Sequence, residues 1–112
     1  MIQLIASVAA FEEALARHAV AVIYKHSPTC GSCLAALDEV RRFAAAQPDV
    51  PVLQVEVLMQ RAVSDGIAER LGVRHASPQV IVVRGGRAAW SATHWDVTAS
   101  ALTEQVSRVG AV

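Results

Sequence analysis

The sequence predicts an α/β fold in which helices flank a central mixed sheet. Short apolar segments rich in β-branched residues alternate along the chain with segments of helical periodicity, and Gly85-Gly86 joins the last two strand candidates. Alternating strands and helices imply parallel strands with right-handed crossovers, whereas a two-glycine turn joins antiparallel strands. The 112 residues, of which 54% are hydrophobic, are enough for a single domain over residues 1–112 with one core.

The first half of the chain predicts two strands and two helices. Residues 2–6 form a short apolar strand candidate, and Ser7 is placed to cap the helix that follows. Residues 19–24 are apolar throughout, which is typical of a strand buried on both faces. The next helix is expected to end near Ala46, because Pro48 cannot continue it. The helix positions expected to face the core are Val8, Phe11, Leu15, Leu34, Leu37, Val40 and Ala44, whereas Glu39, Arg41 and Arg42 are expected to be solvated.

The second half adds three strands and two helices, which gives the order β-α-β-α-β-α-β-β-α. Residues 50–58 form a strand candidate. Ser64 and Asp65 can cap a helix over residues 66–71, which Gly72 is expected to end in a left-handed conformation. The remaining elements are a strand over residues 80–83, its antiparallel partner over 87–92, and a last helix capped by Thr98 with Leu102 and Val106 inward.

Cys30 and Cys33 are the only cysteines, and they lie three residues apart where the buried strand gives way to the second helix. Unpaired N–H groups and the helix dipole favour an anion at a helix start, so the pKa of the Cys30 thiol is expected to be lowered. Its thiolate can attack a disulfide, and Cys33, one helical turn further on, can attack the mixed disulfide that results. A C-x-x-C at this place in an alternating chain is typical of the thioredoxin fold.

Two other roles for the cysteine pair are less well supported. Half of a zinc site would need two more ligands, but there is no second cysteine pair, and none of the four histidines are paired at ligand spacing. We therefore expect no metal. A structural disulfide that closes so short a loop would restrain the unfolded chain very little. A redox-active pair is the favoured interpretation.

Charge and hydropathy argue against several classes of partner. With ten basic and ten acidic residues the formal net charge is zero, so neither nucleic acid nor an anionic membrane is expected as a partner. No apolar run is long enough to span a bilayer. Residues 1–11 are apolar, but no Lys or Arg precedes the run and Glu12-Glu13 follow it. A signal peptide is therefore not expected, and the protein is predicted to be cytoplasmic.

Four further segments carry a more specific resemblance. They are Lys25-His26-Ser27, Ile67-Ala68-Glu69-Arg70 with Gly72-Val73-Arg74-His75, Ser77-Pro78-Gln79-Val80, and His94-Trp95-Asp96 with Thr98. On the basis of these segments the chain resembles the YtxJ-like monothiol bacilliredoxins, and the resemblance covers nearly the whole chain. The resemblance implies a small cytosolic thioredoxin-like protein that removes bacillithiol from mixed disulfides on proteins. It implies no bound cofactor, bacillithiol as a thiol co-substrate, and two kinds of partner: bacillithiolated or disulfide-containing proteins, and a reductant.

Cys33 departs from that family, in which this position is usually a small non-cysteine residue and catalysis uses one thiol. A second thiol allows a protein to resolve its own mixed disulfide and to end as an intramolecular disulfide. The chain also departs from ordinary thioredoxin, because Thr29 replaces a tryptophan before the nucleophile and Tyr24 replaces a buried carboxylate. No acid–base group for the resolving step is therefore evident, which argues against a general thioredoxin role.

The resemblance also assigns residues beside the cysteines. Pro78 matches the proline that is cis in thioredoxin folds, and the backbone of Ser77 is expected to pair with substrate like an added strand. Thr29, Gly31 and Ser32 are expected to contact substrate as well.

Lys25 and His26 precede the cysteines, and a nearby cation would lower a thiol pKa. Adjacent residues on a strand point to opposite faces, so at most one of them is expected to act. His26 is otherwise a packed residue at the strand end. His75 either lines the substrate groove or is solvated, and Trp95 is expected to pack.

Two alternative functions stay open at this point. One is a general thioredoxin- or glutaredoxin-like reductase of protein disulfides. The other is a non-enzymatic thioredoxin-fold adaptor or a metal-binding module.

Overall fold

The computed structural model describes residues 2–29 and 31–110 and contains a five-stranded mixed sheet. The strands are β1 (Ile2–Leu4), β2 (Val20–His26), β3 (Val52–Glu56), β4 (Gln79–Arg84) and β5 (Arg87–Thr93). Their order in the sheet is β1-β3-β2-β4-β5. β3 pairs in parallel with both β1 and β2, whereas β4 is antiparallel to β2 and β5. The predicted α/β class and mixed sheet are confirmed.

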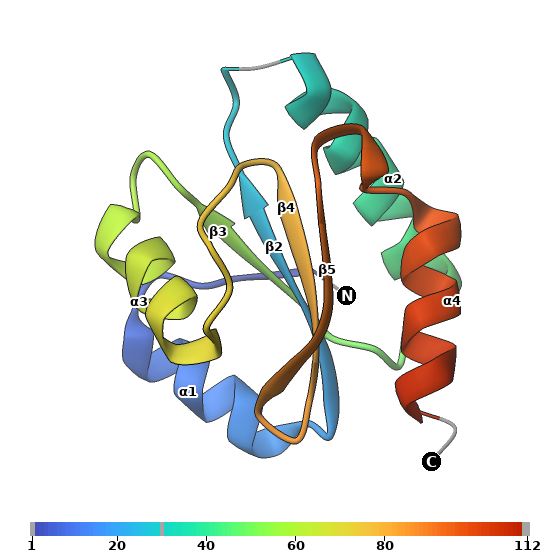
Figure 1. The fold of residues 1–112 in the computed structure, drawn as a ribbon, viewed down its shortest axis with the longest axis horizontal. Coiled ribbons are helices and arrows are strands. Elements are labelled where there is room, and N and C mark those ends of the chain that lie inside the picture. The colour runs from blue at the N-terminus through green and yellow to red at the C-terminus, as the bar shows by residue number, and fades with distance from the viewer. Residues whose placement is uncertain (1, 30, 111–112) are drawn as a thin grey trace.

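Helices cover both faces of this sheet (Figure 1). They are α1 (Val8–Arg17), α2 (Gly31–Ala46), α3 (Arg61–Leu71) and α4 (Ala99–Gly110), and a short 3-10 helix, η1 (His94–Asp96), precedes α4. α1 and α3 lie on one face, and α2 and α4 lie on the other. Within residues 2–29 and 31–110, no helix combines the length and the apolar character that crossing a membrane requires.

β2 separates two hydrophobic cores. Because successive side chains alternate between the faces of a strand, Ile23 packs with residues of α1 and α3, whereas Tyr24 packs with residues of α2 and α4. Residues 21–26 are all buried. The prediction of a central strand buried on both faces is confirmed, and the strand runs beyond its predicted end to His26.

The turns follow the predicted chemistry. The Ser7 hydroxyl accepts the backbone N–H of Ala10 at 3.0 Å and so caps α1. Gly72 ends α3 in a left-handed conformation with φ 67°. Gly85 and Gly86 have φ of 57° and 77°, which is the positive-φ pair that a two-residue hairpin turn between β4 and β5 requires.

The prediction for α3 is wrong at its beginning. The helix begins at Arg61, five residues earlier than the predicted residue 66, and Gln60 is its N-cap residue. Ser64 lies inside the helix and is fully buried, and Asp65 forms an ion pair with Arg61 at 3.5 Å. Serine has a high propensity for helix N-caps, but the burial of Ser64 on the side of α3 that faces the sheet outweighs that preference.

Two apolar helix residues that were predicted to face inward are exposed. Val8 is 43% exposed and Leu34 is 63% exposed. Both lie in the first turn of their helices, at the margin of the helical layer, where the sheet no longer covers every apolar position.

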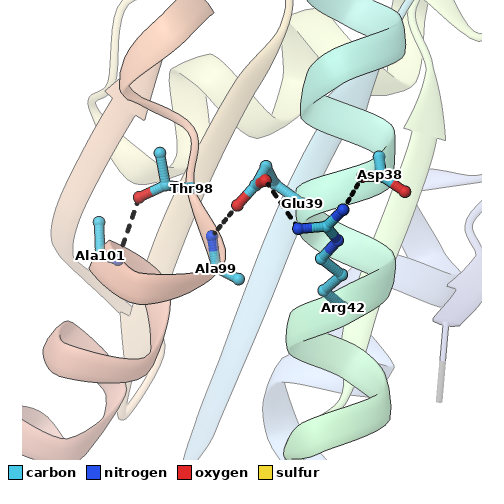
Figure 2. A network of polar contacts seen from close by, with 6 residues as sticks. All are labelled: Asp38, Glu39, Arg42, Thr98, Ala99 and Ala101. Atoms are coloured by element: carbon cyan, nitrogen blue, oxygen red, sulfur yellow. Dashed lines mark hydrogen bonds and ion pairs between the residues drawn. The ribbon is translucent and has the colours of Figure 1, made fainter.

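Glu39 joins α2 to the start of α4 (Figure 2). Its carboxylate accepts the backbone N–H of Ala99 at 2.8 Å, and the Thr98 hydroxyl accepts the backbone N–H of Ala101 at 3.1 Å. These bonds satisfy two N–H groups that have no acceptor within the helix. The predicted Thr98 cap is confirmed, whereas the prediction that Glu39 is merely solvated is wrong, because its carboxylate caps a neighbouring helix.

We expect Glu39→Ala to lower the free energy of unfolding by about 1 kcal/mol, because the first turn of α4 loses an anionic acceptor. Asp38→Ala is the matched control: Asp38 also pairs with Arg42, at 3.0 Å, but its side chain is 61% exposed. Its removal should change the stability by less than about 0.5 kcal/mol. Urea unfolding of the two variants measures the difference, and equal losses would contradict the capping role.

Candidate functional site

Cys33 lies in the first turn of α2 and has no exposed surface. It is disulfide-bonded, and its carbonyl oxygen lies 3.4 Å from the Tyr24 hydroxyl of β2. Gly31, which opens the helix, is exposed, and Ser32 is half-buried. Cys30 lies outside the described residues, so its lowered pKa and its nucleophilic role stay predictions.

Tyr24 and His26 form a buried polar pair on the α2 side of β2. The Tyr24 hydroxyl lies 2.7 Å from His26 Nδ1 and donates at longer range to the Cys33 carbonyl. Tyr24 is fully buried and His26 is 5% exposed. Burial lowers the pKa of His26 below its usual 6.5 and raises the pKa of Tyr24 above its usual 10. At neutral pH the pair is therefore an uncharged imidazole beside a protonated phenol.

Lys25 points to the opposite face, toward α3. It is the only lysine in the sequence, and it is fully buried. Its ammonium group donates to the Ser64 carbonyl at 3.0 Å and contacts His75 Nδ1 at 3.2 Å. The Ser64 hydroxyl lies 3.1 Å from the same His75 nitrogen. With two donors directed at Nδ1, this nitrogen acts as an acceptor and the proton of the neutral ring is on Nε2.

Lys25 and His75 are both harder to protonate than usual. Burial lowers the pKa of Lys25 from 10.5 to about 8, partly offset by Asp65. Burial and, after it, the Lys25 ammonium lower the pKa of His75. His75 is thus a half-buried acceptor whose Nδ1 is bound within the protein and not solvated, and its predicted place in the substrate groove stays a prediction.

The loop between α3 and β4 ends at Ser77-Pro78, whose peptide bond is cis. Pro78 is buried, and its carbonyl accepts the backbone N–H of His94 at 3.0 Å. The buried Gln79 side chain donates to the Arg74 carbonyl at 2.9 Å. Among the residues that the structure describes, the buried oxygens Ser77 Oγ and Gln79 Oε1 have no hydrogen-bond partner. The Gln79 amide therefore connects the start of β4 back to the loop at Arg74.

Ser27 shapes the turn between β2 and α2. Its hydroxyl lies 2.9 Å from the Thr29 hydroxyl and accepts the Thr29 backbone N–H at 3.4 Å. Ser27 is buried, whereas Thr29 is exposed. Thr29 is therefore exposed two residues before α2 begins, where contact with substrate was predicted.

The structure separates the two residues that were predicted to tune the thiol. His26 lies on the same face of β2 as Tyr24, which contacts Cys33, and Lys25 lies on the other face. Because His26 is uncharged at neutral pH, it does not supply the cation that the prediction invoked. The sequence reasoning missed the pairing of His26 with Tyr24, although a Tyr-x-His spacing on a strand puts both side chains on one face.

The prediction that Trp95 packs is wrong. Its side chain is 71% exposed. It lies in η1, a three-residue helix without any buried residue, which is too short to have a core-facing side.

Comparisons with known proteins agree with this geometry. The family described as monothiol bacilliredoxin BrxC matches residues 3–102. A solved protein that is provisionally described as an oxidoreductase with a thioredoxin fold is 28% identical with a TM-score of 0.87, over 93% of this chain and 92% of that chain.

Two thioredoxins are similar in fold. Thioredoxin of Trypanosoma brucei brucei has a TM-score of 0.83 at 14% identity, over 100% of this chain and 93% of its own. Fasciola hepatica thioredoxin has a TM-score of 0.77 at 18% identity, over 95% of this chain and 97% of its own. These likenesses confirm the predicted thioredoxin fold.

We expect Lys25→Met to raise the free energy of unfolding at pH 7 by about 1–2 kcal/mol, because it removes a buried charge and retains the apolar stem. The folded-state pKa of about 8 lies below the usual 10.5, so the unfolded chain binds more protons between these values. Wild-type stability should therefore rise relative to that of the variant as the pH increases through this window.

Urea unfolding at pH 7 and about 9.5 measures this difference. Arg17→Met is the matched control, since Arg17 is 69% exposed and its removal should leave the pH dependence unchanged. A Lys25→Met protein that is less stable than wild type at pH 7 would show that the hydrogen bonds of the lysine outweigh the cost of burying its charge.

Proposed function

The chain belongs to the monothiol bacilliredoxin family, and from this premise we propose that it is a cytoplasmic thiol–disulfide oxidoreductase that removes bacillithiol from mixed disulfides on proteins. Family and fold together support thiol redox chemistry. The choice of bacillithiol as the thiol removed, and of a reductant as the partner that restores the protein, rests on the family alone.

The reaction begins with the Cys30 thiolate. It attacks one sulfur of the mixed disulfide, a new S–S bond forms, and the other sulfur leaves as a thiolate with the electron pair. When the target protein leaves, bacillithiol is carried on Cys30. Cys33 then attacks the Cys30 sulfur and releases bacillithiol, or a second bacillithiol attacks the bound bacillithiol sulfur, forms bacillithiol disulfide and frees the Cys30 thiolate. If Cys33 acts, the protein ends oxidised as an intramolecular disulfide, and a reductant must restore both thiols.

The position of Cys33 is the observation that carries this proposal. Its side chain is buried in the first turn of α2, and in sequence it follows Cys30 by three residues. A residue three positions along a helix lies on the same side about one turn away, within reach of a disulfide on Cys30. The same helix start supports a thiolate at Cys30, because unpaired N–H groups and the helix dipole favour a negative charge there.

We further propose that substrate lies between the start of α2 and the loop before β4. Thr29, Gly31 and Ser32 would contact it on the helix side, and the backbone of Ser77 beside Pro78 would pair with it as an added strand. The exposure of Thr29 and Gly31 is consistent with this role.

A second candidate function is the general reduction of protein disulfides. Two observations favour it: the presence of a second cysteine, and the likeness in fold to thioredoxins over nearly the whole chain. Comparing turnover of a bacillithiolated protein with turnover of an ordinary protein disulfide separates the two functions. Faster reduction of the ordinary disulfide would replace the main proposal with this one.

We expect Cys30→Ser to abolish the release of bacillithiol from a bacillithiolated protein, because a hydroxyl cannot replace the attacking thiolate. Release is measured by mass spectrometry of the target protein. Retained activity in this variant would end the proposal.

Cys33→Ser is the matched substitution, and it distinguishes the two routes. If Cys33 resolves the intermediate, the variant should accumulate bacillithiol on Cys30, visible as a mass increase of the enzyme. If turnover continues at the wild-type rate with bacillithiol in solution, a second bacillithiol resolves the intermediate, and the chain uses one thiol.

A further inference from the structure

Tyr24 and His26 form a buried polar pair that contacts the Cys33 carbonyl. An imidazole can supply the proton acceptor that the resolving step requires. Resting on the function proposed above, we infer that His26 accepts the proton of the Cys33 thiol when this thiol resolves the mixed disulfide, and that Tyr24 positions the imidazole. His26 thereby acts as an uncharged base and not as a cation.

A buried resolving thiol needs a proton acceptor. Cys33 has no exposed surface, so bulk water does not reach its sulfur directly. A free thiol has a pKa of about 8.5, and apolar surroundings raise it, yet only the thiolate attacks a disulfide. Tyr24 cannot fill this role, because burial raises the pKa of its phenol and the phenol therefore stays protonated at neutral pH.

The contacts of Tyr24 connect the end of β2 with the first turn of α2. Tyr24 already reaches α2, because its hydroxyl lies 3.4 Å from the carbonyl oxygen of Cys33. His26 lies on the same face, one pleat or about 6.6 Å further along the strand. It is the last residue of β2, next to the turn that leads into α2. The imidazole is therefore connected to Cys33 through a single hydroxyl, which lies 2.7 Å from His26 Nδ1 and 3.4 Å from the Cys33 carbonyl oxygen.

The hydrogen bonds allow the imidazole to exist with and without an extra proton. When the Tyr24 hydroxyl turns toward the Cys33 carbonyl, His26 Nδ1–H donates to the phenol oxygen at 2.7 Å, and in this tautomer Nε2 carries the lone pair that can accept a proton. A proton taken up at Nε2 then leaves this arrangement intact. Tyr24 thus fixes the ring and its tautomer in the way that a positioning residue does for a general base.

The charged groups around the pair keep the base poised. Glu56 is the residue opposite His26 in the β2–β3 register, and its carboxylate raises the pKa of His26, while burial, the larger effect, and Arg41 of α2 lower it. Lys25 is directed to the other face and contacts Ser64 and His75. The imidazole is consequently neutral near pH 7 and able to take a proton.

The step balances as follows. Cys33–SH gives its proton to His26, and the thiolate attacks the Cys30 sulfur of the mixed disulfide. The Cys30–Cys33 bond forms, the bond to the carried thiol breaks, and the leaving thiolate takes the proton from the imidazolium. In this step the Cys33 sulfur is oxidised to the disulfide level, the leaving sulfur is reduced to a thiol, and His26 returns to its neutral state; over the two attacks together the dithiol loses two electrons and the substrate disulfide gains them.

The test follows both attacks in one experiment. Reduced protein is mixed with one equivalent of dithiobis(nitrobenzoate), which releases one coloured thiolate when Cys30 attacks and a second when Cys33 resolves. His26→Asn retains an amide that can bond to Tyr24 but cannot act as a base. We expect its first phase to be unchanged and its second phase to be slowed about 100-fold near pH 7.

The pH profile supplies a readout that a merely structural role would not change. In wild-type protein the second phase should be nearly constant from about pH 6.5 to 8, because His26 is already neutral there. In His26→Asn it should rise about tenfold per pH unit until the thiol itself ionises near its pKa. His18→Asn, at an exposed histidine, is the matched control and should change neither phase.

Tyr24→Phe keeps the imidazole but removes its anchor, and we expect its second phase to be slowed roughly tenfold. If His26→Asn does not fold, the second phase of Tyr24→Phe tests the inference in its place. Wild-type second phases in folded variants at position 26 or 24 would overturn the inference and leave the proposed function intact. If wild-type protein itself shows no second phase, Cys33 does not resolve the intermediate, and the dithiol route falls together with the role of His26.

Discussion

The complete burial of β2 is the constraint on which the rest of the structure depends. Residues 21–26 are all buried, yet the last three of them, Tyr24, Lys25 and His26, carry polar groups. A buried polar group without a hydrogen-bond partner costs about 1–3 kcal/mol, and a buried charge costs more. The strand can therefore end in this way only because each of these side chains finds a partner on its own face of the sheet.

Strand alternation then divides the polar groups between two environments. The phenol and imidazole of Tyr24 and His26 face α2 and meet the backbone of Cys33, whereas the Lys25 ammonium faces α3 and fixes His75 in the loop that leads to the cis peptide bond before Pro78. A buried lysine with a pKa of about 8 is a cost in stability. Such a cost is typical of residues that hold a functional site in place.

Much of the fold followed from local patterns, because Ser7, Gly72, Gly85-Gly86 and Thr98 act through their immediate neighbours in sequence. The α3 start did not, since Ser64 has the propensity of a cap but is fixed by Lys25 and His75, thirty-nine residues before it and eleven after it. In the site, alternation correctly separated Lys25 from His26. It could not show that burial leaves His26 uncharged, because this depends on the helix that covers it.

The most direct test of this account is the titration of the His26 imidazole by NMR in the reduced protein, with assignment confirmed by loss of the signal in His26→Asn. A pKa below the ordinary 6.5, with the nitrogen shifts of a neutral ring hydrogen-bonded at Nδ1, is the predicted result. An imidazole that titrates at or above 6.5 would be a cation over much of the neutral range, and this result would contradict both its burial against Tyr24 and its role as the base for Cys33.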